Sequence, residues 1–136
     1  MHVSDLIDDL AEALATFPAA AEWRVGVATY TDGPGSDISV MYVASYNTDA
    51  DEEFFLVPEG MGEAFGLAER PFTAKQLLDE LQAHPAWAGQ AVCVRSEVIR
   101  MPDGSLACRS KMAWGAGVHE GARLVYFYYG AVGADA

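Results

Sequence analysis

Two stretches with helical spacing of apolar residues, each followed by three strand-like runs, constrain this chain more than any other feature. Apolar residues recur three and four positions apart at residues 4–17 and 73–84, which predicts two amphipathic helices. β-branched and aromatic residues, which favour strands, are frequent in the runs that follow each helix. We expect strands at 23–31, 38–46, 54–57, 91–99, 105–113 and 124–129. The expected order of elements is αβββ-αβββ.

The two halves also share a weak sequence repeat. The segment Leu6–Leu10 has the same apolar and acidic pattern as Leu77–Leu81, and Pro18 and Pro85 follow these segments at comparable distances. A true duplication and a chance likeness between amphipathic helices both remain open. We expect one α+β domain, with a mainly antiparallel sheet of about six strands and two helices on one face. It would span 1–136, with halves at about 1–58 and 72–130 and a connector at 59–71.

The proline-containing turn at 102–104 predicts a hairpin with a defined register. If these three residues form the loop, the strands before and after it pair from Met101 and Ser105 outward. Apolar side chains then share one face of the hairpin. The expected partners are Val94 with Met112 and Val98 with Cys108.

The composition is strongly acidic. Lysine and arginine number eight and aspartate and glutamate twenty, so the formal net charge is −12. Such a charge repels phosphate backbones and anionic membranes. The chain also has no stretch of about 18 apolar residues and no signal-peptide pattern at its start. We therefore expect a cytoplasmic protein that binds neither nucleic acid nor membranes directly.

The negative charge is concentrated in the first half. Residues 1–69 hold fourteen acidic residues and one basic residue, Arg24, whereas residues 70–136 have a net charge of +1. On a helical wheel, four carboxylates lie opposite the apolar face of the first helix, and an acidic loop is expected at 47–53. We expect these two segments to bind a basic protein partner. The residues proposed for contact are Asp5, Asp8, Asp9, Glu12, Asp49, Asp51, Glu52 and Glu53.

This charge pattern suggests a non-enzymatic binding protein. The first hypothesis is a stoichiometric inhibitor, of the toxin-immunity or phage and mobile-element type, that docks onto a basic partner acting on nucleic acid. Complementary charge would speed the encounter and orient the two proteins. The alternative is a dimeric chaperone or assembly adaptor that uses an exposed strand edge or the apolar run 124–129.

The sequence offers few residues for catalysis. Cys93 and Cys108 have neither a CxxC partner nor a metal-ligand spacing, so we expect two free thiols and no metal site. A third hypothesis is a small enzyme or ligand-binding domain centred on His119 and Glu120, in the glycine-rich loop 115–121. A solvated histidine in a β-turn accounts for the same residues. We expect no catalytic residue and no cofactor.

Overall fold

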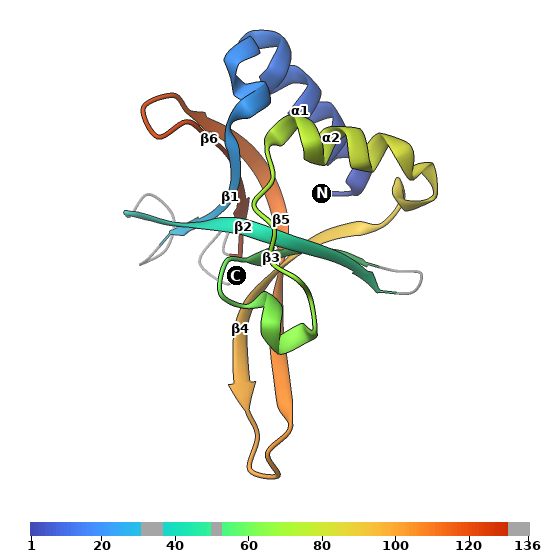
Figure 1. The fold of residues 1–136 in the computed structure, drawn as a ribbon, viewed down its shortest axis with the longest axis vertical. Coiled ribbons are helices and arrows are strands. Elements are labelled where there is room, and N and C mark those ends of the chain that lie inside the picture. The colour runs from blue at the N-terminus through green and yellow to red at the C-terminus, as the bar shows by residue number, and fades with distance from the viewer. Residues whose placement is uncertain (31–36, 50–52, 131–136) are drawn as a thin grey trace.

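The computed structural model describes residues 1–30, 37–49 and 53–130 (Figure 1). Within these ranges the chain forms two α-helices and six strands, which confirms the expected α+β class. Three short 3-10 helices, η1 to η3, lie between them. The elements are α1 (Val3–Thr16), η1 (Pro18–Glu22), β1 (Arg24–Tyr30), β2 (Ile38–Asp49), β3 (Glu53–Pro58), η2 (Gly62–Phe65), α2 (Ala74–Ala83), η3 (Pro85–Trp87), β4 (Ala91–Arg100), β5 (Leu106–His119) and β6 (Leu124–Tyr129).

The six strands form one closed barrel in the order of the chain. Neighbours are antiparallel within β1–β3 and within β4–β6, but β3 is parallel to β4 and β6 is parallel to β1. The sheet is therefore mixed, where a mainly antiparallel one was expected. The first parallel pair arises because α2 connects β3 to β4, and a helical crossover returns the chain in the same direction. The second parallel pair closes the barrel.

Both helices lie side by side over one end of the barrel, opposite the projecting hairpin of β4 and β5 (Figure 1). Their apolar faces point inward: Leu6 and Leu10 of α1 and Leu77 and Leu81 of α2 are at most 1% exposed. These leucines join the inward side chains of the strands, such as Phe127, in one core. Burial of each such side chain contributes about 1.5–3 kcal/mol, so the helices are held mainly by this contact.

The start of each helix is fixed by local hydrogen bonds. In α2 the hydroxyl of Thr73 accepts from the backbone N–H of Gln76 at 3.1 Å, and the Gln76 side chain accepts from the Thr73 N–H at 2.9 Å. Threonine followed three residues later by glutamine is the sequence pattern of such a capping box. The first helix begins at Val3, and the His2 N–H donates to the Asp5 carboxylate at 2.8 Å. The carboxylate of Asp5 therefore accepts a backbone hydrogen bond at the N-terminus of α1.

A second, smaller apolar cluster lies on the outside of the barrel. Phe55 and Val57 of β3 and Cys93 of β4 are at most 6% exposed there. The connector between β3 and α2 covers them with Met61, Phe65 and Leu67. This packing holds the connector against the sheet, where it forms one wall of a surface pocket described below.

Two strands run well past their predicted ends, and one register is partly wrong. β2 continues to Asp49 and β5 to His119, so residues expected in loops belong to strands. Val98 does pair with Cys108, as expected, but Val94 pairs with Lys111 instead of Met112. The cause is a register shift between Arg95 and Glu97, where one extra residue enters one strand.

Candidate binding surfaces

The acidic residues expected on the first helix do lie on its solvent side. Asp5, Asp8 and Glu12 are exposed and Asp9 is half-buried, while the opposite side of α1 enters the core. We call Asp8, Asp9 and Glu12 the acidic face of α1. Asp5 is set apart because it binds the His2 N–H and lies 3.7 Å from the His2 ring nitrogen Nδ1.

The acidic face of α1 carries uncompensated negative charge. Among the described residues, no lysine or arginine forms an ion pair with Asp8, Asp9 or Glu12. Partial burial raises the pKa of Asp9 above its ordinary value of 3.8, and the carboxylates of Glu12, Asp5 and Asp8 raise it further. The carboxylate of Asp9 is therefore repelled by its neighbours in the native protein, and a bound cation would reduce this repulsion.

A groove of about 240 Å³ runs beside this acidic face, between α1 and β5. Asp9 and Glu12 contribute to its lining, and Phe17, Ala116 and Val118 supply apolar groups. Lysine and arginine side chains have an apolar stem and a cationic end, so they match such a mixed lining. The sequence pattern indicates these carboxylates but not the groove, because the strand at 105–113 was expected to end before Ala116.

The second acidic segment is only partly described. Asp51 and Glu52 lie outside the described residues. Asp49 and Glu53 pair with one another at the ends of β2 and β3, which corrects the expectation that they belong to a loop. Glu53 also pairs with Ala91 of β4, the residue that bridges to His2. The structure therefore places this corner one strand away from the start of α1.

Glu53 already has a partner inside the molecule. The thiol of Cys93 donates to its carboxylate at 3.1 Å. Burial, with this hydrogen bond and the negative charge of Glu53, raises the pKa of Cys93 to about 12. Cys93 and Cys108 are both free, and the thiol of Cys93 stays protonated at neutral pH.

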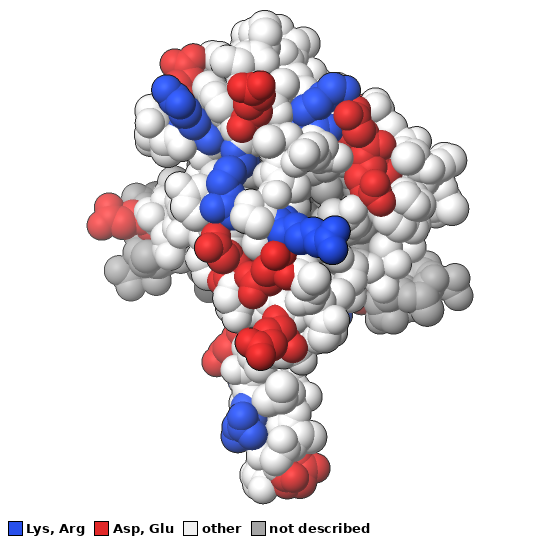
Figure 2. Space-filling view, in the orientation of Figure 1, with Lys and Arg blue, Asp and Glu red and all other residues white. Residues whose placement is uncertain are grey.

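Charges of both signs mix on the face shown in Figure 2. Arg24 pairs with Glu59 at 3.1 Å and Lys75 pairs with Asp79 on α2. On this face, negative charge of the first half is therefore partly neutralised, as at Glu59 beside Arg24.

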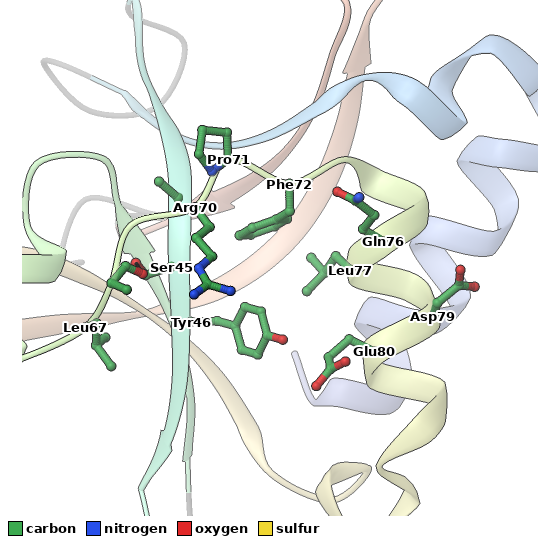
Figure 3. Close-up of a pocket in the computed structure, with 12 residues that line it drawn as sticks. Ser45, Tyr46, Leu67, Arg70, Pro71, Phe72, Gln76, Leu77, Asp79 and Glu80 are labelled. Carbon is green, nitrogen blue, oxygen red and sulfur yellow. Dashed lines mark hydrogen bonds between the residues drawn. The ribbon is translucent and has the colours of Figure 1, made fainter.

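A pocket of about 720 Å³ lies between β2, the connector and α2 (Figure 3). Figure 3 shows Arg70, Tyr46 and Glu80 around it, with the Tyr46 hydroxyl directed toward Glu80. Burial raises the pKa of Tyr46 to about 12, and the neighbouring carboxylate of Glu80, which accepts from the hydroxyl, adds to the shift. No residue of this pocket was predicted as a site, because its walls come from segments far apart in the sequence.

A third hollow, of about 440 Å³, exposes apolar side chains of β2. Ile38, Val40 and Tyr42 are 42–46% exposed on the outer side of this strand. Leu124 and Tyr126 of β6 line the same hollow. We call this set the apolar strip. The sequence predicted the strands but not which of their alternating faces stays uncovered.

His119 borders the apolar strip and ends β5, where a loop was expected. Its Nδ1 accepts from the backbone N–H of Ala122 at 3.0 Å, so the ring helps to shape the turn before β6. This contact fixes the tautomer with the proton on Nε2. The geometry assigns His119 a structural contact and gives Glu120 no catalytic partner among the described residues.

Comparisons with known proteins identify no relative: neither a family model, nor a curated protein, nor a solved structure matches the chain. Within the described ranges, no helix has the length and apolar character needed to cross a membrane. Among the residues that the structure describes, no three histidine, cysteine, aspartate or glutamate side chains are close enough together to bind a metal ion.

Proposed function

We propose that this protein is a non-enzymatic binding module whose acidic face of α1 docks onto a basic protein partner. The acidic face of α1 borders the groove of α1 and β5 and has no lysine or arginine partner among the described residues, and this observation carries the proposal. A lysine or arginine of the partner would lie in this groove, with its stem on Ala116 and Val118 and its charge beside Asp9 and Glu12. Binding would replace a like-charge repulsion by an attraction.

A stoichiometric inhibitor of a nucleic-acid-handling protein is the class that fits this surface best. Proteins that bind nucleic acid carry clusters of lysine and arginine that meet the phosphates. An acidic surface of complementary shape competes for the same groups, as inhibitors of the toxin-immunity or phage and mobile-element type would. We place the complex in the cytoplasm, where reducing conditions keep free thiols such as Cys93 and Cys108 reduced.

Affinity capture with two variants of equal charge tests this function. The acidic-face variant combines Asp8→Asn, Asp9→Asn and Glu12→Gln. The matched control combines Glu63→Gln, Glu97→Gln and Asp103→Asn, which removes the same charge at positions outside α1 and its groove. We expect the wild type and the control to retain a basic partner from a lysate of the native host, and the acidic-face variant to lose it. Equal retention by both variants would contradict the proposal.

The apolar strip favours a second candidate, a dimeric chaperone or assembly adaptor. Three alternating residues of β2, namely Ile38, Val40 and Tyr42, are exposed together, and contiguous exposed apolar surface often marks an interface. Residues 95–100 of β4 and 106–111 of β5 pair only with one another in the described structure, so strand edges remain for this role, whereas Val125 and Phe127 of the last strand are buried in the core. Sedimentation at micromolar concentration would show a dimer that Val40→Lys dissociates. A wild-type monomer would rule this candidate out.

We also propose that the fold consists of two αβββ units derived by duplication. Their registers agree in detail: Glu53 of β3 pairs with Ala91 at the start of β4, as Leu124 of β6 pairs with Arg24 at the start of β1. Both β2–β3 and β5–β6 contain a register shift, after Val43 and after Ala113 respectively. These shared irregularities are harder to explain by chance than the order of elements.

A further inference from the structure

The pocket between β2 and α2 has the size and the firm walls of a small-molecule site. Its volume of about 720 Å³ lies within the range of roughly 300–1,000 Å³ that is usual for such sites. The Arg70 N–H donates to the Ala44 carbonyl at 2.9 Å, and the Ser45 hydroxyl donates to the Ala68 carbonyl at 3.1 Å. These bonds tie the connector to β2, so this wall is formed before any ligand enters.

The wall on the helix side is equally fixed. The capping box at Thr73 holds the first turn of α2, and the Ala74 N–H donates to the Trp23 carbonyl at 2.8 Å. Phe72 packs edge-on against Tyr46 with ring centroids 5.8 Å apart. A ligand would therefore meet a site whose backbone and aromatic groups are already in place, which lowers the entropic cost of binding.

The polar groups of the pocket divide into a cationic and an anionic side. The Arg70 guanidinium points into the space beside Tyr46 (Figure 3) and forms no ion pair or hydrogen bond within the described part of the chain. Across the Tyr46 ring, Glu80 directs its carboxylate toward the Tyr46 hydroxyl. Its other neighbour is the Nδ1 atom of His84, 3.6 Å away. Asp79 also lines the pocket, and its carboxylate pairs with Lys75.

Apolar groups line the space between these two sides. Leu67, Pro71, Phe72 and Leu77 contribute to the lining, together with the ring of Tyr46. A flat apolar body would cover these groups, while charged ends would reach Arg70 and Glu80. An unpaired guanidinium favours a carboxylate because it can donate two parallel hydrogen bonds.

We propose that this pocket binds a small zwitterion whose carboxylate and ammonium groups lie at opposite ends of an apolar or aromatic body. The carboxylate pairs with Arg70, the body lies against Tyr46 and Phe72, and the ammonium group donates to Glu80. This site is independent of the proposed docking function, because it shares no residue with the acidic face of α1.

Three probes that differ only in their charges test the proposal by calorimetry or NMR titration. 4-(Aminomethyl)benzoate carries both charged groups, benzoate lacks the ammonium group, and benzylamine lacks the carboxylate. We expect 4-(aminomethyl)benzoate to bind about tenfold more tightly than either other probe, as expected when one charge-assisted hydrogen bond is lost. Equal binding of 4-(aminomethyl)benzoate and benzoate would overturn the zwitterion assignment, as would no binding of any probe at millimolar concentration.

Paired variants locate the binding. In Arg70→Gln, 4-(aminomethyl)benzoate should bind no more tightly than benzylamine, because its carboxylate has lost its partner. In Glu80→Gln, 4-(aminomethyl)benzoate should bind no more tightly than benzoate, because its ammonium group has lost its partner. The controls are Arg100→Gln and Glu97→Gln, at two exposed positions of the projecting hairpin that do not line the pocket. Both controls should bind as the wild type does, and circular dichroism checks that every variant is folded. Probe affinities unchanged in Arg70→Gln and Glu80→Gln would overturn the proposal.

Discussion

Arg24 and Thr73 form an antiparallel bridge, so the residue that opens β1 is joined to the residue that caps α2. His2 and Ala91 form the corresponding bridge between the start of α1 and the start of β4. Each helix is therefore anchored to the first strand of the other half. Neither half can leave the structure without breaking contacts made by both.

Because these two bridges join each helix to the other half of the chain, we expect the protein to unfold in a single transition. Leu10 of α1 and Leu81 of α2 are fully buried in the same core. We expect Leu10→Ala and Leu81→Ala each to lower the free energy of unfolding by about 2–5 kcal/mol, because both leave a cavity. Urea unfolding followed by tryptophan fluorescence and by circular dichroism should give coincident curves for both variants. Separate transitions would show that the halves unfold independently.

A glycine of β5 is required by an aromatic neighbour. A Cβ atom added at Gly117 would lie 2.6 Å from the Tyr126 ring, closer than real contacts allow. We expect Gly117→Ala to lower the free energy of unfolding by about 1–3 kcal/mol because the ring must move. Gly115→Ala, two residues earlier on the same strand, is the control, since its added Cβ comes no nearer than 3.9 Å to Tyr128. Thermal denaturation of the two variants checks this difference.

Stability should fall in alkaline solution as tyrosines ionise. The pKa of Tyr46 rises from 10 to about 12 on folding, so below pH 10 this residue is neutral in both states. Between pH 10 and about 12 only the unfolded state loses the proton, which favours unfolding. We expect the free energy of unfolding to decline less over this interval in Tyr46→Phe than in the wild type.

The same pKa can be followed directly. The difference in tyrosinate absorbance between the wild type and Tyr46→Phe should have its midpoint near pH 12. Glu80→Gln should lower this midpoint, because it removes the negative charge next to the phenolate. A midpoint near pH 10 in the wild type would contradict the burial of Tyr46 beside Glu80.

Asp9 should weaken the native state at neutral pH. Its pKa is raised on folding, so the charged form is disfavoured in the native protein. The penalty is present at pH 7 and disappears as the pH falls through the raised pKa toward 3.8, where the native state takes up its proton first. We expect Asp9→Asn to stabilise the protein at pH 7, with Glu63→Gln as a neutral control. A destabilised Asp9→Asn would mean that Asp9 has a favourable partner.

Local sequence signals anticipated much of the fold. The two helices form where apolar residues recur three and four positions apart, and the strands form where β-branched and aromatic residues are dense. The register around Val98 was also correct, since the turn at 102–104 sets it. The shift at Ser96 could not be foreseen, because a bulge preserves the alternation on each side of it and moves only the pairing.

Contacts between residues far apart in the sequence could not be predicted from local sequence patterns. The parallel pairing of β6 with β1 closes the barrel, yet nothing near Leu124 or Arg24 in the sequence indicates it. For the same reason, the acidic residues of α1 were predicted while the groove beside them was not. Arg70 and Glu80 come together only once the connector has folded back against β2.

Salt dependence of binding tests the docking surface most directly. The measurement is the dissociation constant of the purified complex with the captured basic partner at several salt concentrations. If the acidic face of α1 docks onto the basic partner, the affinity of the wild type and of the matched control falls as the salt concentration rises. The acidic-face variant should bind at least about tenfold more weakly at low salt and respond less to added salt. An acidic-face variant with the affinity and salt dependence of the wild type would contradict docking through the acidic face of α1.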